Sequence, residues 1–325
     1  MKSETEGADP ELSVIVALIE GGRTATETCL DALAISSEGT NIECLIPFDT
    51  RLDGVHELQA KYPWATFIDA RESVNADEFG SSSREHHDIL RAIGLRSAKA
   101  PIVALLEDHG TPDPAWCPAL MKAHRKSDAA VIGGAVENGR NRVLNWAVYF
   151  CDFGRYQNPV PVGPVELARD SNVSYKREAL MSIRQQWFSA YHETSVHWAI
   201  RHRGGQIRLD PKMVVYQTRN RLDLFSALRE RFVWGRSFAG TRSSEITPSK
   251  RFTFALLSFL LPFVLTARIA VRGFGKRLHL PKLLLALPLV FVLETIWAFG
   301  EFVGYVTGKA AAGKRIPKQL GQDSL

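Results

Sequence analysis

Short apolar runs alternate with helix-like segments along residues 12–216, and this alternation is the strongest structural signal in the chain. The runs are rich in β-branched residues and end at polar or glycine positions, as buried strands do; they lie at 12–19, 43–48, 65–69, 101–106 and 129–136. Residues 26–35 have helical spacing, and runs at 206–209 and 213–216 predict a later pair of strands. Strands that alternate with helices indicate an α/β fold with a mostly parallel sheet.

Acidic residues stand at the ends of four predicted strands: Glu20, Asp49, Asp69 and Glu107. In an open α/β sheet, ligands bind outside the carboxyl ends of the strands. Any single acidic residue can instead be a turn former. Four in succession favour a polar site along one edge of the sheet.

Two long apolar segments follow this region, at residues 252–271 and 283–307. The first has 16 uncharged residues before Arg268, whose long side chain can reach the headgroups. The second is long enough to span a bilayer, but Glu294 and Glu301 interrupt it, and each is costly in hydrocarbon. A hairpin of two spanning helices is the first prediction. Helices that lie in the interface or re-enter it are the second, and a soluble helical cap is the third.

The positive charge of the chain is concentrated in this tail. Residues 252–325 carry nine Lys and Arg against three acids, a net charge of +6, whereas residues 1–251 carry 31 bases and 32 acids, a net charge of −1. A nucleic-acid-binding domain needs a basic face on its folded body, so the neutral body argues against that class. Basic residues beside apolar segments indicate anionic lipid headgroups as the partner.

The cysteines and the N-terminus predict a folded body in the cytoplasm. Cys29, Cys44, Cys117 and Cys151 lie far apart without a CxxC pair, so we expect no zinc or disulfide framework. Residues 1–11 are polar, are expected to be disordered, and lack the apolar stretch of a signal peptide. The sequence therefore predicts a membrane protein whose catalytic domain is on the cytoplasmic side.

Several motifs, in their order and spacing, resemble those of family 2 glycosyltransferases with the GT-A fold. Residues 13–16, Ser-Val-Ile-Val, resemble the opening strand of that family. Residues 94–109 resemble the helix and strand that lead to its Asp-x-Asp motif, and residues 172–177 are similar to the stretch that closes over the acceptor. Residues 192–194, His-Glu-Thr, are similar to the Glu-Asp-Thr motif, and residues 229–235 to the Arg/Trp/Gly segment after it.

The resemblance covers roughly residues 11–240 and implies a domain division. Residues 12–240 would form a GT-A-like domain with a doubly wound, mixed and mostly parallel sheet. Residues 241–325 would form a membrane-associated helical tail, since membrane helices after the catalytic domain are common in this family.

The resemblance also implies roles for individual residues. Glu193 stands at the position of the general base, and a partly desolvated carboxylate suits that role. The remaining positions would bind the donor (Asp49, Glu107, Asp108, with Glu20 as a weaker candidate), the diphosphate or a lipid phosphate (Arg229, Arg231) and the acceptor (Asn172, Tyr175, His192).

The sequence departs from the family pattern at three chemical positions. The Asp-x-Asp motif is Glu107-Asp108-His109, the Glu-Asp pair is His192-Glu193, and Gln217 replaces the expected downstream His. In an extended segment Glu107 and His109 point the same way. We therefore expect Glu107, His109 and Gln217 to hold a divalent cation, with Mn²⁺ favoured over Mg²⁺ because an imidazole is a softer ligand.

Simpler structural explanations stand beside these roles. His109 can be a turn residue, Asp49 can form an Asx turn, and Glu193 can be an acid in the first turn of a helix. Arg229 and Arg231 can belong to a solvated helix face. For each of these residues, the sequence does not decide between the structural and the chemical role.

The sequence thus predicts a metal-assisted glycosyltransferase that moves a sugar from a nucleotide sugar to a lipid or lipid-linked glycan at the membrane. Inversion by a single displacement is implied by the resemblance alone. The alternative is a non-catalytic sugar-nucleotide-binding or scaffold protein on the same fold. A nucleotidyltransferase is disfavoured because no glycine-rich phosphate loop follows the first strand.

Overall fold

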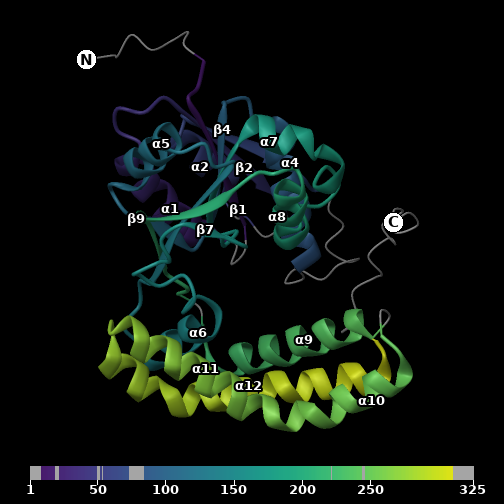
Figure 1. Ribbon diagram of the computed structural model, residues 1–325. Coiled ribbons are helices and arrows are strands. Elements are labelled where there is room, and N and C mark those ends of the chain that lie inside the picture. The colour runs from purple at the N-terminus through teal and green to yellow at the C-terminus, as the bar shows by residue number, and fades with distance from the viewer. Residues whose placement is uncertain are drawn as a thin grey trace.

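A computed structural model describes residues 9–18, 22–49, 52, 54–72, 84–220, 222–243 and 246–309. Glu20 of the expected site lies outside these residues. Figure 1 shows two layers: an α/β body that contains the sheet, and beneath it a helical layer made of α6 and α9 to α12. The elements that precede α6 in the chain all belong to the body.

The described residues contain a nine-stranded sheet. The strands are β1 (Leu12–Ala17), β2 (Ile42–Phe48), β3 (Ala65–Asp69), β4 (Ile102–Glu107), β5 (Gly110–Pro112), β6 (Val131–Asn138), β7 (Pro164–Val165), β8 (Asn172–Lys176) and β9 (Ile207–Gln217). The helices of the body are α1 (Arg23–Ser36), α2 (Val55–Lys61), α4 (Arg84–Ser97), α5 (Trp116–Lys126), α7 (Arg177–Ser182), the 3₁₀ turn η1 (Arg184–Gln186) and α8 (Glu193–His202). The helical layer contains α6 (Val143–Asp152), α9 (Leu224–Arg242), α10 (Pro248–Leu257), the 3₁₀ turn η2 (Ser258–Leu260), α11 (Leu261–Lys276) and α12 (Leu280–Thr307).

The sheet has the order β3-β2-β1-β4-β8-β6-β9-β5, with β7 paired to β9. The first four strands are mutually parallel, and β6 pairs parallel with β9. β8 enters antiparallel between β4 and β6. This arrangement confirms the predicted α/β class with a mixed, mostly parallel sheet.

Two apolar cores cover the two faces of the sheet. Successive side chains of a strand point to opposite faces, so Val14 and Val16 of β1 pack in one core and Ile15 between them packs in the other. The first core includes residues of α1 and α5, and the second includes residues of α7 and α8. Figure 1 shows these helix pairs on opposite sides of the sheet.

One expectation about the strands needs correction. The runs at 206–209 and 213–216 form a single strand, β9, rather than a pair. Its register with β6 shifts between Gly134 and Ala135, which pair with Asp210 and Val214. Pro211 has no N–H for the ladder, so the strand continues past it through an irregularity.

The two apolar tail segments form helices, as expected. Pro248–Lys276 and Leu280–Thr307 are long and apolar enough to cross a membrane by length and composition alone. α12 packs along α9 with very close backbone contact. A Cβ added to Gly235 of α9 would lie 2.2 Å from the Trp297 carbonyl oxygen, and one added to Gly300 of α12 would lie 2.3 Å from the Phe232 carbonyl oxygen. Gly300 and Gly304 have the four-residue spacing of small residues that is typical of closely packed membrane helices.

A short connection joins the sheet to the helical layer. β9 ends at Gln217 and α9 begins at Leu224, with residues 218–223 between them. Asp223 caps α9 by accepting a hydrogen bond from the Ser226 N–H at 3.0 Å. The strand that borders the expected site therefore leads directly into the helix that contacts the apolar tail.

Candidate functional site

The acidic ends of β2 and β4 lie at the same edge of the sheet. β1 separates these two strands and is parallel to both. Ala17, the last residue of β1, is in register with Glu107, and its carbonyl accepts a hydrogen bond from the Asp108 N–H at 3.0 Å. Asp49 directly follows β2. Asp69 ends β3, which pairs in parallel with β2. The expected carboxyl-edge arrangement is therefore present for Asp49, Asp69 and Glu107.

Asp49 is buried at this edge, with 2% of its surface exposed. Its carboxylate contacts Nε2 of His86, a fully buried residue of α4. A buried carboxylate needs such a partner because desolvation of an unpaired charge is costly. The nucleoside-binding role of Asp49 stays a prediction.

His109 stands between two carboxylates. Its Nδ1 lies 3.2 Å from Oδ1 of Asp108, and its Nε2 lies 3.4 Å from Oε2 of Glu107. All three residues are at most 5% exposed. Burial lowers the pKa of His109, but the hydrogen bond to Asp108 and the charges of both carboxylates outweigh it, so the pKa is raised overall.

Arg91 of α4 joins this group to acids from other elements. Its guanidinium lies 3.2 Å from Asp88, 2.8 Å from Glu107 and 3.3 Å from Asp170. Burial alone would lower the pKa of Arg91, yet these three negative charges raise it. Arg91 therefore holds carboxylates from a helix, a strand end and a loop around one buried cation.

Glu193 is held in the same region from the first turn of α8. Its Oε2 accepts a hydrogen bond from the Asp170 N–H at 3.0 Å and lies 3.7 Å from the Arg169 guanidinium. Arg169 also contacts the Asp170 carboxylate at 3.2 Å. Asp88, Arg91, Glu107, Asp170, Arg169 and Glu193 thus form one ion-pair network. Two residues that are 86 positions apart, Glu107 and Glu193, belong to this single buried arrangement.

Gln217 borders His109 from the neighbouring strand. Gly110 pairs with Gln217, and the Thr218 N–H donates to the His109 carbonyl at 2.8 Å. The Gln217 side chain is buried, and neither Oε1 nor Nε2 has a hydrogen-bond partner among the described residues. A buried amide without partners is uncommon, so this position calls for an explanation.

The donor atoms fit a divalent cation by their chemistry. A carboxylate, an imidazole and an amide oxygen form a set that suits Mn²⁺. Within the ranges that the structure describes, no three His, Cys, Asp or Glu side chains are grouped so that they could hold a metal ion. The ring nitrogens of His109 instead face Asp108 and Glu107. A metal-binding role for Glu107, His109 and Gln217 stays a prediction.

The expected acceptor-side residues differ in exposure. The His192 side chain is 43% exposed and lies 3.9 Å from Asp88, at the border of the ion-pair network. Asn172 is fully buried, accepting from Trp116 Nε1 at 2.8 Å and donating to the carbonyls of Ala135 and Met213. The Tyr175 hydroxyl is also buried, 2.5 Å from Tyr191 and 2.8 Å from His197. Asn172 and Tyr175 thus have structural partners, and a role toward the acceptor stays a prediction for all three.

The two expected basic residues lie on α9 in the helical layer. Arg229 is exposed, whereas Arg231 is buried and donates to Asp152 of α6 at 2.6 Å. Arg231 therefore ties α9 to α6. Contact of either residue with a diphosphate or a lipid phosphate stays a prediction.

Sequence reasoning missed four members of the ion-pair network: Asp88, Arg91, Arg169 and Asp170. One local signal was available, because Asp88 and Arg91 are three positions apart, which is the spacing of neighbouring side chains on a helix. The Arg169-Asp170 pair stands just before the residue 172–177 motif without a pattern of its own. Its partners come from other elements, so only the fold could bring them together.

Comparison with known proteins gives a structural match but no sequence match. No protein-family model and no curated protein matches the chain. The solved structures that match include the mannosyltransferase PcManGT from Pyrobaculum calidifontis, in complex with GDP-Man and Mn²⁺. The sequence identity is 13%, the TM-score is 0.53, and the match covers 91% of this chain and 88% of that one.

The extent of this match identifies the fold. Coverage of 91% is more than residues 12–240 can supply, so the similarity includes part of the C-terminal helices. Together with the mixed sheet described above, it shows that this chain has an α/β glycosyltransferase-like fold followed by two apolar helices.

Proposed function

We propose that this protein transfers a sugar from a nucleotide-sugar donor to a lipid or lipid-linked glycan at the cytoplasmic face of a membrane. The observation that carries the proposal is the ion-pair network, which links the strand end at Glu107 to the helix start at Glu193. A glycosyl transfer needs one group of residues for the donor diphosphate and one carboxylate for the acceptor. The network holds candidates for both.

Glu193 would act as the general base. The Asp170 N–H and Arg169 fix the orientation of its carboxylate, which is the preorganisation that proton transfer requires. It would take the proton from the acceptor hydroxyl as that oxygen attacks the sugar carbon of the donor. A single displacement of this kind inverts the configuration at that carbon.

The donor would bind along the carboxyl edge of β1, β2 and β4. Asp49 would bind the nucleoside, and Asp108 and Glu107 would border the diphosphate. A divalent cation, Mn²⁺ rather than Mg²⁺, would be held by Glu107, His109 and Gln217, and when bound it supplies Lewis-acid stabilisation of the leaving diphosphate. Arg91 and Arg169 offset the repulsion among the clustered acids, so the site keeps its shape before the donor binds.

The lipid character of the acceptor rests on the C-terminal helices. β9 borders the site and leads within residues 218–223 to α9, which packs on the apolar α12. An acceptor that is anchored in lipid would therefore meet the site close to the membrane. The fold of the mannosyltransferase solved with GDP-Man and Mn²⁺ is consistent with a nucleotide-sugar donor.

A binding screen followed by turnover tests the proposal. The full chain in detergent is heated with each of a panel of nucleotide sugars, with and without Mn²⁺. A donor at 100 times its dissociation constant should stabilise the fold by about 2.7 kcal/mol. The donor identified in this way is then offered to lipid-linked acceptors, and product formation is measured.

Glu193→Gln and Glu178→Gln form a matched pair for the catalytic step. Both acids stand in the first turn of a helix, but Glu178 of α7 is exposed and belongs to no part of the network. Glu193→Gln should lower turnover by roughly 10²–10⁴-fold with donor binding retained, and Glu178→Gln should leave turnover unchanged. Equal effects would reduce Glu193 to a helix-end residue. Donor binding without turnover for the unmodified chain would indicate a non-catalytic sugar-nucleotide-binding protein.

A further inference from the structure

We propose that α10, α11 and α12 lie in the plane of one membrane leaflet, on anionic lipid, and do not cross the bilayer. The proposal concerns how the chain meets the membrane and stands independently of the transfer reaction. It rests on the contacts at the two ends of α12, on the charges of α9, and on the distribution of exposed apolar and basic residues.

The turn before α12 contacts the sheet. Nε2 of His279 lies 3.5 Å from Oε2 of Glu137, a residue of β6, and the His279 ring lies 4.8 Å from the Trp146 ring. Gln157 Nε2 donates to the Leu278 carbonyl at 3.3 Å. The turn between the two apolar helices is therefore on the side of the α/β body.

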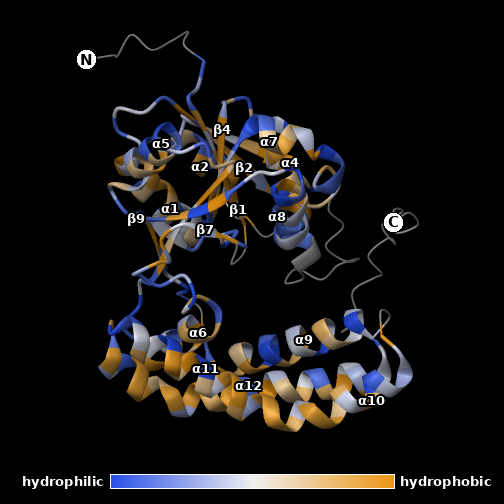
Figure 2. Ribbon diagram, in the orientation of Figure 1, coloured by the Kyte–Doolittle hydropathy of each residue, from blue (hydrophilic) through white to orange (hydrophobic). Residues whose placement is uncertain are grey.

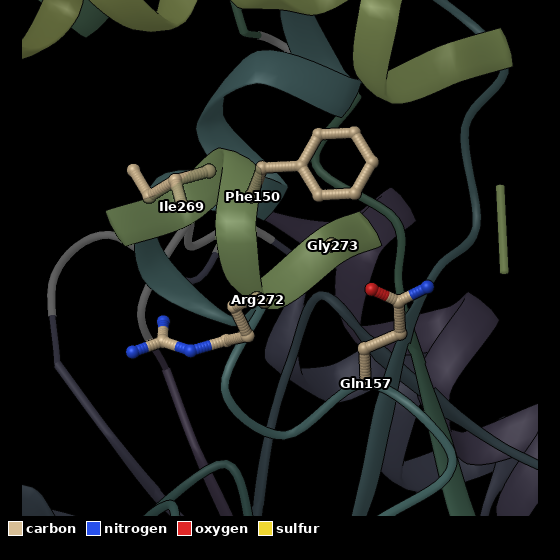
Figure 3. Close-up of a pocket in the computed structure, with 6 residues that line it drawn as sticks. Phe150, Gln157, Ile269, Arg272 and Gly273 are labelled. Atoms are coloured by element: carbon tan, nitrogen blue, oxygen red, sulfur yellow. The ribbon is translucent and has the colours of Figure 1, made fainter. Parts of the chain in front are cut away.

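The end of α11 makes similar contacts. A small pocket between α6 and α11 is lined by Phe150, Gly154, Gln157, Ile269, Arg272 and Gly273 (Figure 3). Nζ of Lys276 donates to the Arg155 carbonyl at 3.1 Å. These contacts join the last turns of α11 to the segment that follows α6, so the His279 contact is one part of a larger interface.

The other end of α12 is held by α9. Gly304 packs against the backbone of Arg236 and Gly240 in α9, and Nη1 of Arg242 lies 3.5 Å from the Tyr305 hydroxyl. α12 has 28 residues and a length of about 42 Å, which exceeds a hydrocarbon core of about 30 Å. In a spanning hairpin its two ends would lie on opposite sides of the membrane. Here the turn before α12 contacts the body, and the far end of α12 contacts α9, which Figure 1 shows lying along the layer beneath the body.

The charges of α9 disfavour immersion of its contact with α12. α9 (Leu224–Arg242) packs along α12, and it carries five charged residues: Arg229, Glu230, Arg231, Arg236 and Arg242. A spanning α12 would take this helix into the hydrocarbon, where each charge is costly. With α12 in the plane of the leaflet, α9 lies above it on the aqueous side.

The opposite side of the layer is apolar. Figure 2 shows the layer as mostly hydrophobic, in contrast to the mixed surface of the body. Large side chains with at least 44% exposure occur on all three helices and on η2; they include Phe252, Phe259, Phe263, Val271, Leu285 and Val292. This is the distribution of an interfacial helix, with apolar residues that enter the acyl region.

The charge around this apolar face favours lipids with anionic headgroups. Lys250, Arg268, Arg277 and Lys309 are exposed on the tail helices and their ends. The acids of these helices, Glu294 and Glu301, are buried. The exposed charge next to the apolar residues is therefore positive, which favours anionic headgroups over neutral ones.

Cysteine accessibility in sealed membrane vesicles tests the orientation. Leu278→Cys marks the turn between the apolar helices, Thr307→Cys marks the far end of α12, and Val292→Cys marks the exposed apolar face. Ser182→Cys, exposed on α7, marks the side of the body. Each full-length variant is treated with a membrane-impermeant maleimide before and after detergent. The parent chain, whose Cys29, Cys44 and Cys117 are buried and Cys151 half-buried, gives the background.

We expect Leu278→Cys, Thr307→Cys and Ser182→Cys to react to the same extent before detergent, and Val292→Cys to react only after it. A Leu278→Cys that stays protected while the other two marker positions react would establish a spanning hairpin and overturn the proposal. A Val292→Cys that reacts in intact vesicles would also overturn it, because that face would then be in water.

Flotation separates lipid from other occupants of the apolar face. Detergent-depleted full chain should float with vesicles that contain phosphatidylglycerol and float much less with phosphatidylcholine alone. Equal flotation would refute the anionic preference. A soluble dimer that floats with neither kind of vesicle would show that a second copy of the chain covers the apolar face.

Discussion

Gly300→Ala probes the contact that holds α12 against α9. The added Cβ would lie 2.3 Å from the Phe232 carbonyl oxygen and 2.9 Å from the Arg236 nitrogen, and both atoms belong to the backbone of the facing helix. Neither atom can rotate away, so the helices must separate by several tenths of an ångström. Overpacking of this kind costs about 1–3 kcal/mol, and an alanine within a helix offsets about 1 kcal/mol of that cost.

Gly275→Ala is the matched control for this change. Gly275 lies in α11, and a Cβ there would have no atom within 4 Å. Gly275 stands in the last turn of α11, so alanine gains at most as much helix preference there as at Gly300, and the difference between the variants is a lower bound on the strain of about 1–3 kcal/mol. Thermal unfolding of the full chain in one detergent should place Gly300→Ala several degrees below Gly275→Ala. Equal unfolding temperatures would refute the close packing of α9 and α12.

Three further outcomes follow from the site and its surroundings. Arg91→Met should lower the free energy of unfolding by about 3–5 kcal/mol in denaturant titrations, because three carboxylates lose their cation, and Arg91→Lys should lower it less. Burial lowers the pKa of His197 from 6.5 to about 4, so the unfolded chain takes up the proton first. The contribution of His197 to the free energy of unfolding is then complete above pH 6.5 and falls by about 3 kcal/mol as the pH approaches 4. His197→Gln should lose this part of the pH dependence in urea unfolding curves, and an unchanged pH dependence would contradict the prediction. Activity should require added metal and favour Mn²⁺ over Mg²⁺, His109→Ala should lose that preference, and full activity in excess EDTA would refute the metal proposal.

The sequence predicted most of the sheet because its strands are locally distinctive. Ala65–Asp69 has the predicted bounds, and β1, β2 and β4 differ from prediction by at most two residues at either end. β9 was divided in two because Pro211 resembles a chain break when only local pattern is considered. Its continuity depends on pairing with β6, which a single sequence does not display.

The candidate site was predictable where position in the sheet determines it. Glu107 and Asp49 follow directly from the rule that strand ends meet at one edge. Arg91 and Arg169 were not found, because their role arises from partners on other elements. Arg91 shows this plainly: its contact with Glu107 crosses 16 positions, and its contact with Asp170 crosses 79. Burial and charge balance decide such pairings, and both depend on the completed fold.

If the helical layer lies on a membrane as proposed, the short connection from β9 to α9 limits the distance between the membrane and the site. A chain from Gln217 to Leu224 spans at most about 25 Å even when it is fully extended, so the edge of the site next to Gln217 cannot rise higher than that above α9. A sugar acceptor with a long glycan would carry its growing end beyond this height, whereas one with few or no sugars would keep its hydroxyl within it. The connection therefore sets a maximum height for the site, and we expect turnover to fall as the glycan on a lipid acceptor lengthens.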